Sequence, residues 1–176
     1  MAGDVLASYS PEDVTIVISV PEAGISHTVN GYVDGTFVTI SRLVLGSEPY
    51  SGADVTNARV VRSNKNATIT LSLGQYSESN DILSQLLQND SQTRDSTWLF
   101  SVLIKDNTGR SMYFSRQCYI GGHPDSTFST TLDTRDWNIH CIKLEQNIGG
   151  NAQLSPSTYQ ELVDLGADIE ERWVPA

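Results

Sequence analysis

Strict alternation between apolar and small polar residues is the feature that most constrains how this chain folds. The stretch "NATITLSLG", residues 66–74, places Ile69, Leu71 and Leu73 on one side of an extended chain. Residues 13–20, "DVTIVISV", repeat the pattern with an apolar residue at every second position. Because successive side chains of a strand point to opposite faces, both stretches predict strands with one face against a core.

The second face of these two strands is small and uncharged, whereas many solvated strands carry Lys and Glu there. Its members are Thr15, Val17, Ser19, Asn66, Thr68, Thr70 and Ser72. Threonine is common in strands for its β propensity alone, so an ordinary solvated face is one interpretation. A surface specialised for a partner is the other, and the pattern alone leaves both open.

Further strands are predicted over 36–43, in a hairpin over 96–120, and over 126–146. In the last region the apolar set changes parity between Ile139 and Ile142, which predicts a β-bulge or a kink. These runs indicate a mainly β chain, a mostly antiparallel barrel or sandwich.

Two helices complete the prediction. In "SESNDILSQLLQND" the apolar residues form one helical stripe, which suits a helix that covers one patch of the sheet. Ser155 as N-cap, Pro156 at the first helical position and Gly166 as a left-handed stop predict a short C-terminal helix. The predicted domain spans 1–151, with 152–176 as a helix and acidic tail extension.

The connection over 44–64 is rich in Gly, Pro, Ser and Asn and lacks a sustained period. Connections in compact domains usually run to about 4 to 6 residues, so a longer one is functional or mobile. We interpret it as an interaction loop, the alternative being a flexible hairpin extension. Its candidate contact residues are Ser47, Glu48, Tyr50 and Asp54.

Composition excludes several classes of function. The 21 acidic against 11 basic residues give a formal net charge of −10, and a chain without a basic patch is a poor nucleic-acid binder. No apolar run approaches the ~20 residues of a membrane span, and the first residues lack an export leader. Cys118 and Cys141 are either two reduced, partly buried residues or the partners of a disulfide within or between subunits.

The residues needed for catalysis or metal binding do not converge in the sequence. The three histidines, His27, His123 and His140, lie far apart and none has a Cys or acidic partner at ligand spacing. The glycine pairs lack the Lys of a phosphate loop. We therefore expect a protein that is not an enzyme and needs no cofactor or metal.

Five segments, in this order and spacing, resemble the inner tail tube proteins of contractile-tailed bacteriophages. They are "VDGTFVTISR" (33–42), "SNDILSQLLQND" (79–90), "SVLIKDNTGR" (101–110), "RDWNI" (135–139) and "NIGGN" (147–151). The resemblance covers roughly residues 9–151. It implies a small β-barrel or sandwich of two packed antiparallel sheets with one flanking helix, in stacked rings of six copies inside a sheath.

The resemblance also implies a location and partners. The protein would be part of the virion tail, assembled in the host cytoplasm, and would contact itself, the tail sheath, the baseplate and the tail terminator. The tape measure protein and phage DNA would occupy the lumen transiently. A DNA conduit must not bind phosphate, so we expect the small polar residues named above to face the lumen.

The tail beyond residue 152 lies outside the resemblance. Its acidic residues, Asp164, Asp168, Glu170 and Glu171, are expected on the tube exterior, where they could meet a basic sheath surface. A solvated, frayed terminus is the alternative. Two other functions stay open: a ring or tube protein of a bacterial contractile secretion system, and a ligand-binding β-sandwich.

Overall fold

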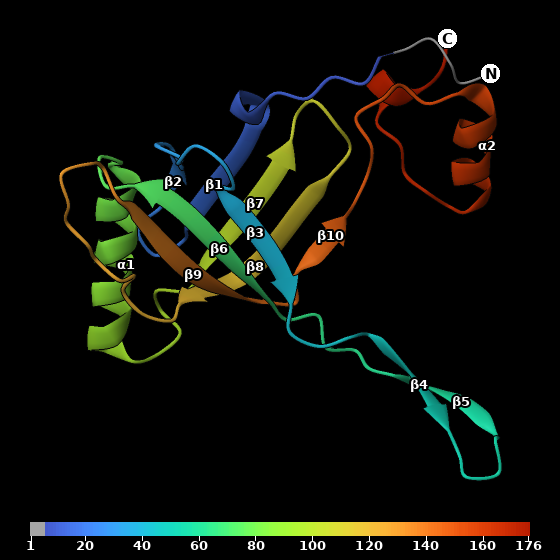
Figure 1. The fold of residues 1–176 in the computed structure, drawn as a ribbon, viewed down its shortest axis with the longest axis horizontal. Helices are drawn as coiled ribbons and strands as arrows, with labels where there is room; N and C mark the ends of the chain where they lie inside the picture. The colour runs from blue at the N-terminus through green and yellow to red at the C-terminus, as the bar shows by residue number, and fades with distance from the viewer. Residues whose placement is uncertain (1–5) are drawn as a thin grey trace.

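The computed structural model describes residues 6–176, and its body is one antiparallel sheet of eight strands (Figure 1). The strands of this sheet are β1 Val14–Val20, β2 Ile25–Thr28, β3 Val38–Arg42, β6 Ala67–Gly74, β7 Phe100–Asp106, β8 Met112–Ile120, β9 Thr134–Ile142 and β10 Glu145–Asn147. Their order is β2-β1-β7-β8-β9-β6-β3, and β10 pairs with β8. The first residues, predicted to lack an export leader, lie outside the described residues.

The alternation of the sequence is reproduced in the burial of the strands. In β6, Ile69, Leu71 and Leu73 are fully buried, while the residues between them are partly exposed. In β1, Ile16 and Ile18 are buried in the same way. Full burial of each such side chain stabilises the fold by about 1.5 to 3 kcal/mol, so this pattern determines which face of each strand is inside.

The sheet folds over, so that its two halves face each other. Figure 1 shows β3 and β6 lying across β7 and β8. Val38 and Ile40 of β3 share a cleft of about 450 Å³ with Val14 of β1 and Ile104 of β7, which places the inner faces of the two halves opposite one another. The mainly β prediction is confirmed. Its two packed layers are halves of one sheet, whose hydrogen-bonded path among the described strands ends at β2 and β3 without closing a barrel.

The helix α1, Ser79–Thr93, packs against this sheet, as its apolar stripe predicts. Leu83 and Leu86 are buried in the core, and Asn80 accepts a hydrogen bond from the indole N–H of Trp137 at 2.9 Å. The helix ends where Arg94 adopts a left-handed conformation with φ 52°.

The prediction of a bulge or a kink between Ile139 and Ile142 is wrong. The strand β9 pairs with β6 without a register shift, and the inward residue after Ile139 is Cys141. The change of parity comes just after the strand, where Lys143 takes φ 52° and turns the chain so that Leu144 is buried. An irregularity does occur elsewhere, in the pairing of β7 with β8.

The segment over 44–64 forms a two-stranded hairpin that projects from the body (Figure 1). Its strands are β4 Ser47–Ser51 and β5 Asn57–Val61. All residues of β5 are exposed, and none of the hairpin belongs to the core cluster. The segment is thus an ordered arm, although its sequence has no strand period.

The predicted C-terminal helix is confirmed as α2, Pro156–Asp164. The Ser155 hydroxyl accepts a hydrogen bond from the Thr158 N–H at 3.3 Å, and Gly166 ends the helix region with φ 82°. Two 3₁₀ turns flank the fold, η1 Pro11–Asp13 near the N-terminus and η2 Glu171–Trp173 near the C-terminus.

Candidate functional site

The outward side chains of β6 and β9 form a ladder of hydrogen-bonded pairs across the two strands. Thr68 Oγ1 lies 3.2 Å from Nδ1 of His140. Thr70 donates to the Asn138 side-chain oxygen at 3.0 Å, and Ser72 donates to a carboxylate oxygen of Asp136 at 2.6 Å. These bonds tie the short polar side chains of one strand to those of the other, so that the surface is polar and its hydroxyl groups are held in place.

This ladder is part of a wider face without Lys or Arg. The outward positions of the three neighbouring strands, paired in register, are Thr39 and Ser41 of β3, Thr68, Thr70 and Ser72 of β6, and Thr134, Asp136, Asn138, His140 and Ile142 of β9. We call these residues the hydroxyl face. The hydroxyl face has a single formal charge when His is counted as neutral, and this is the negative charge of Asp136. A face of this kind attracts phosphate weakly or not at all.

Asn66, predicted with the same set, has a different place. It precedes β6, and its side-chain oxygen accepts a hydrogen bond from the Lys143 N–H at 3.2 Å. Its carbonyl oxygen accepts from the Leu43 N–H at 3.1 Å. Asn66 therefore joins the ends of three strands.

Thr15, Val17 and Ser19 lie on the outward face of β1, beside Lys105 and other residues of β7. Because the inner faces of the two halves meet across the cleft, this β1 face and the hydroxyl face point away from each other. The structure therefore brings Thr68, Thr70 and Ser72 together and separates them from the β1 set.

The arm places all four predicted contact residues away from the core. The Tyr50 side chain is 59% exposed. Glu48 forms an ion pair with Arg62 at 3.3 Å, and Ser47 begins β4. Hydrogen bonds from Thr56 hold the pKa of the Asp54 carboxyl below its usual range. The arm thus offers an aromatic side chain on an internally bonded hairpin.

The acidic residues of the C-terminal segment differ in their surroundings. Glu170 pairs with Lys105 at 3.0 Å and with Arg172 at 2.7 Å, and the hydrogen bond from Lys105 lowers the pKa of its carboxyl most. Asp164 accepts a hydrogen bond from Gln160, whereas Asp168 and Glu171 are exposed.

Trp173 anchors the C-terminal segment to the body of the protein, and the sequence did not predict this role. The guanidinium groups of Arg110 and Arg172 lie over its ring, at 4.7 and 4.9 Å from the ring centroid. Its indole N–H is buried without a partner among the described residues. The nearest signal in the sequence was the Trp itself, because an aromatic residue in a polar tail often marks a docking point.

Cys118 and Cys141 face each other across β8 and β9, with their sulfur atoms 3.1 Å apart. Both are buried free thiols. The contact with Cys118, together with burial, raises the pKa of the Cys141 thiol. The pair therefore belongs to the core of the sandwich.

Among residues 6–176, no three His, Cys, Asp or Glu side chains are grouped to hold a metal ion. No helix in this described part of the chain is long and apolar enough to cross a membrane.

Comparison with known proteins identifies the family. The profile of the Bacteriophage PhiTE tail tube protein matches residues 6–149. Structural protein ORF10 of Pseudomonas phage KPP10 is 42% identical over 168 residues, which are 96% of this chain and 97% of that protein.

Two solved structures are similar at a distance. The cap that terminates the tube of the anti-feeding prophage is 11% identical with a TM-score of 0.46, over 84% of this chain and 97% of that one. The sheath/tube terminator of the extracellular contractile injection system PVC is 12% identical with a TM-score of 0.46, over 76% and 93%. The family match and the ORF10 relative show that this chain belongs to the phage PhiTE tail tube protein family, whose members are structural, non-enzymatic components of the virion tail.

Proposed function

We propose that the chain forms six-membered rings that stack into a tail tube, with the hydroxyl face lining its bore. The observation that carries this proposal is the absence of Lys and Arg from the outward positions of β3, β6 and β9. A bore that conducts DNA must not bind phosphate and must present no long mobile side chains. The tethered hydroxyl and amide groups meet both requirements, and Asp136 adds a negative potential.

The outward face of β1 is less suited to a bore. Lys105 lies directly beside Thr15 in register, and its ammonium group pairs with Glu170 of the C-terminal segment. One copy cannot turn both faces to a single axis, since they point away from each other. We therefore assign Thr15, Val17 and Ser19 to the outer side of the ring wall.

We assign the contact between successive rings to the arm. Its exposed Tyr50 is a suitable anchor, because aromatic side chains bury a large area at a small entropic cost. Deleting residues 47–56 should give a chain that folds but does not stack. Tyr50→Ala should weaken stacking, whereas Tyr9→Ala, which alters a tyrosine that is 60% exposed on the body, serves as a matched control.

The C-terminal segment is proposed to lie outside the tube-forming domain, with Asp168 and Glu171 toward a contractile sheath. Glu170 contributes less to such a contact, because Lys105 and Arg172 already neutralise it. Binding of sheath protein should weaken as salt rises, since exposed charges are screened. In the phage, the tape measure protein and DNA would pass through the bore, and baseplate and terminator proteins would bind the two ends of the tube.

Electron microscopy of the purified chain in negative stain tests the assembly directly. Long stacked tubes support the proposal. Isolated rings would favour a ring of a secretion machine, and monomers at every protein concentration would favour a binding module. Trp173 is buried and is therefore a poor candidate for the exposed aromatic platform of such a module.

A further inference from the structure

The helix α2 carries an acidic face that forms no ion pair with any cation of residues 6–176. None of its residues is buried, and Leu165 at its end is 82% exposed. Asp164 and Leu165 lie three and four positions after Glu161, so all three share one side of the helix. A leucine with two carboxylates beside it is suited to a groove that is apolar at its floor and basic at its rim.

The body has a groove with this character, formed by β8 and by the chain around the end of β9. It has a volume of about 320 Å³ and is lined by Phe114, Arg116, Gln117, Ile142, Lys143 and Glu145. Phe114 and Ile142 are half-buried and apolar, while Arg116 and Lys143 are exposed. We call this the basic groove, although Glu145 also lies on its rim.

The two cations of the basic groove have no acidic partner in the described chain. The ion pairs found in residues 6–176 involve Arg62, Lys105 and Arg172 only. The groove is therefore a local positive site on a chain whose net charge is −10.

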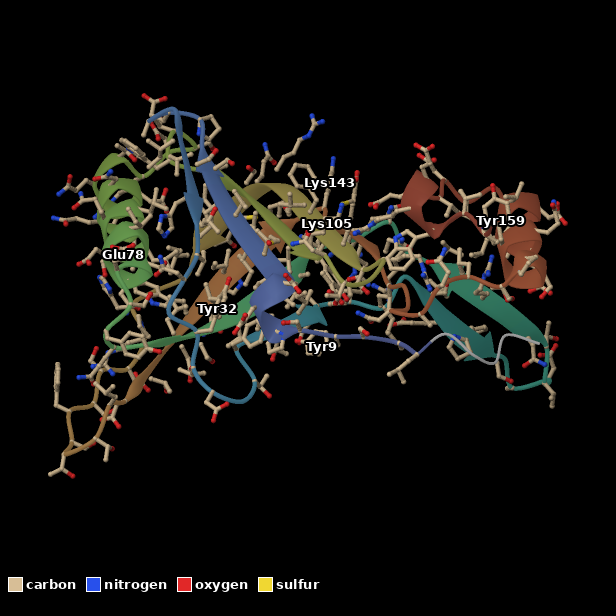
Figure 2. All side chains as sticks on the ribbon, turned by 90° about the horizontal axis from the view of Figure 1, so that it is seen from above. Tyr9, Tyr32, Glu78, Lys105, Lys143 and Tyr159 are labelled. Carbon is tan, nitrogen blue, oxygen red and sulfur yellow. The ribbon has the colours of Figure 1, made fainter. Side chains whose placement is uncertain are left out.

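The acidic face does not reach the groove of its own chain. Among the described residues, no hydrogen bond or ion pair joins α2 to the basic groove. In Figure 2, Tyr159 marks α2 at one end of the molecule, and Lys143 lies over its middle.

We propose that the acidic face of α2 in one copy docks into the basic groove of a second copy. Copies of charge −10 repel one another when packed in a tube, and a contact of opposite charges offsets part of that repulsion. The contact joins two different surfaces, which is the geometry that propagates rings and filaments. This docking proposal rests on the proposed function. The basic groove includes Ile142, the last outward residue of β9, so its cations lie next to the proposed bore and would attract phosphate if α2 did not cover them.

A charge exchange in the purified full-length chain tests the proposal. Arg116→Glu with Lys143→Glu should reduce sedimentable tubes by about tenfold or more, and Glu161→Lys with Asp164→Lys should do the same. All four changes together should restore the tubes, because the charges are again opposite. Unaltered tube formation in either double variant would overturn the proposal.

Two controls separate local pairing from other effects. Arg94→Glu, which alters an exposed cation at the end of α1, should leave tubes intact. Adding Glu22→Lys and Asp125→Lys to the Arg116→Glu, Lys143→Glu variant restores the wild-type net charge at other exposed positions and should not restore tubes. If it does, net charge explains the effect and the proposed contact is wrong.

Crosslinking gives an answer that does not require tubes. Chains with Leu165→Cys and chains with Gln117→Cys, mixed and treated with a short bismaleimide, should form heterodimers, fewer at high salt. Pairing Leu165→Cys with Gln92→Cys, an exposed site on α1, should give about tenfold less product. Equal yields would reject the docking site, whereas absence of tubes in the wild type would reject the proposed function alone.

Discussion

The hydroxyl face and the outward face of β1 begin from the same sequence pattern and differ in what the fold places around them. On the hydroxyl face, Thr68, Thr70 and Ser72 are bonded to His140, Asn138 and Asp136. No Lys or Arg occupies an outward position of β6 or β9. The outward face of β1 lies beside Lys105, which forms an ion pair with Glu170 of the C-terminal segment. The same alternating pattern therefore gives a continuous polar surface without Lys or Arg only where the neighbouring strands also contribute small polar residues.

The largest expected effect comes from adding positive charge to each face in turn. Thr68→Lys with Thr70→Lys places ammonium groups in the proposed bore of every ring and should slow genome ejection by on the order of tenfold or more. Thr15→Lys with Ser19→Lys makes the same change on the outer side and should leave ejection unchanged. The test measures the ejection kinetics of phage that carry each double variant, after microscopy has shown that their tubes are assembled. Equal slowing by the two double variants would contradict the assignment of the hydroxyl face to the bore.

Removing the anchor beside the β1 face should have the next largest effect. Trp173→Ala should lower the free energy of unfolding by about 2 to 3 kcal/mol, because a buried aromatic side chain is lost. Trp173→Phe should cost less, since it keeps a ring beside Arg110 and Arg172 and removes an indole N–H that has no partner. Chemical denaturation measures both, and equal losses would show that stacking contributes little.

Single hydroxyl groups compare the two faces on a finer scale. Ser72→Ala removes a hydrogen bond to the Asp136 carboxylate and should cost about 1 kcal/mol of stability. Ser19→Ala removes a bond between two exposed hydroxyl groups, Ser19 and Ser26, and should cost less than about 0.5 kcal/mol. Thermal unfolding of the two variants checks the order, and the reverse order would argue against a tethered hydroxyl face.

The smallest effect concerns pH and the ion pairs next to the β1 face. The hydrogen bond from Lys105, with a further contribution from Arg172, lowers the pKa of Glu170 in the folded state. Its contribution to stability is therefore present above the ordinary glutamate pKa and is lost as pH falls through the folded pKa. Glu170→Gln should be slightly less stable than wild type at neutral pH, and the difference should disappear once the pH falls below the folded-state pKa of Glu170. Glu171→Gln is the control, and a difference that persists in acid would exclude the charge as its cause.

Much of the fold follows from local patterns in the sequence. The alternation of Ile69, Leu71 and Leu73 predicted the strand and its buried face, and Ser155 with Gly166 predicted both ends of α2. The bulge was mispredicted because Cys141 was not counted as an inward residue and because Lys143, a residue that seldom takes a positive φ, makes the turn.

The candidate surfaces were predictable only in part. The sequence by itself determined which residues of each strand point outward, because alternation is a property of the extended backbone and burial of apolar side chains selects the inner face. The tertiary structure alone decided that Thr15 and Thr68 face opposite ways, that Trp173 docks against two arginines, and that Arg116 and Lys143 share a groove. These outcomes depend on how the sheet folds over, which is set by packing between residues far apart in the chain.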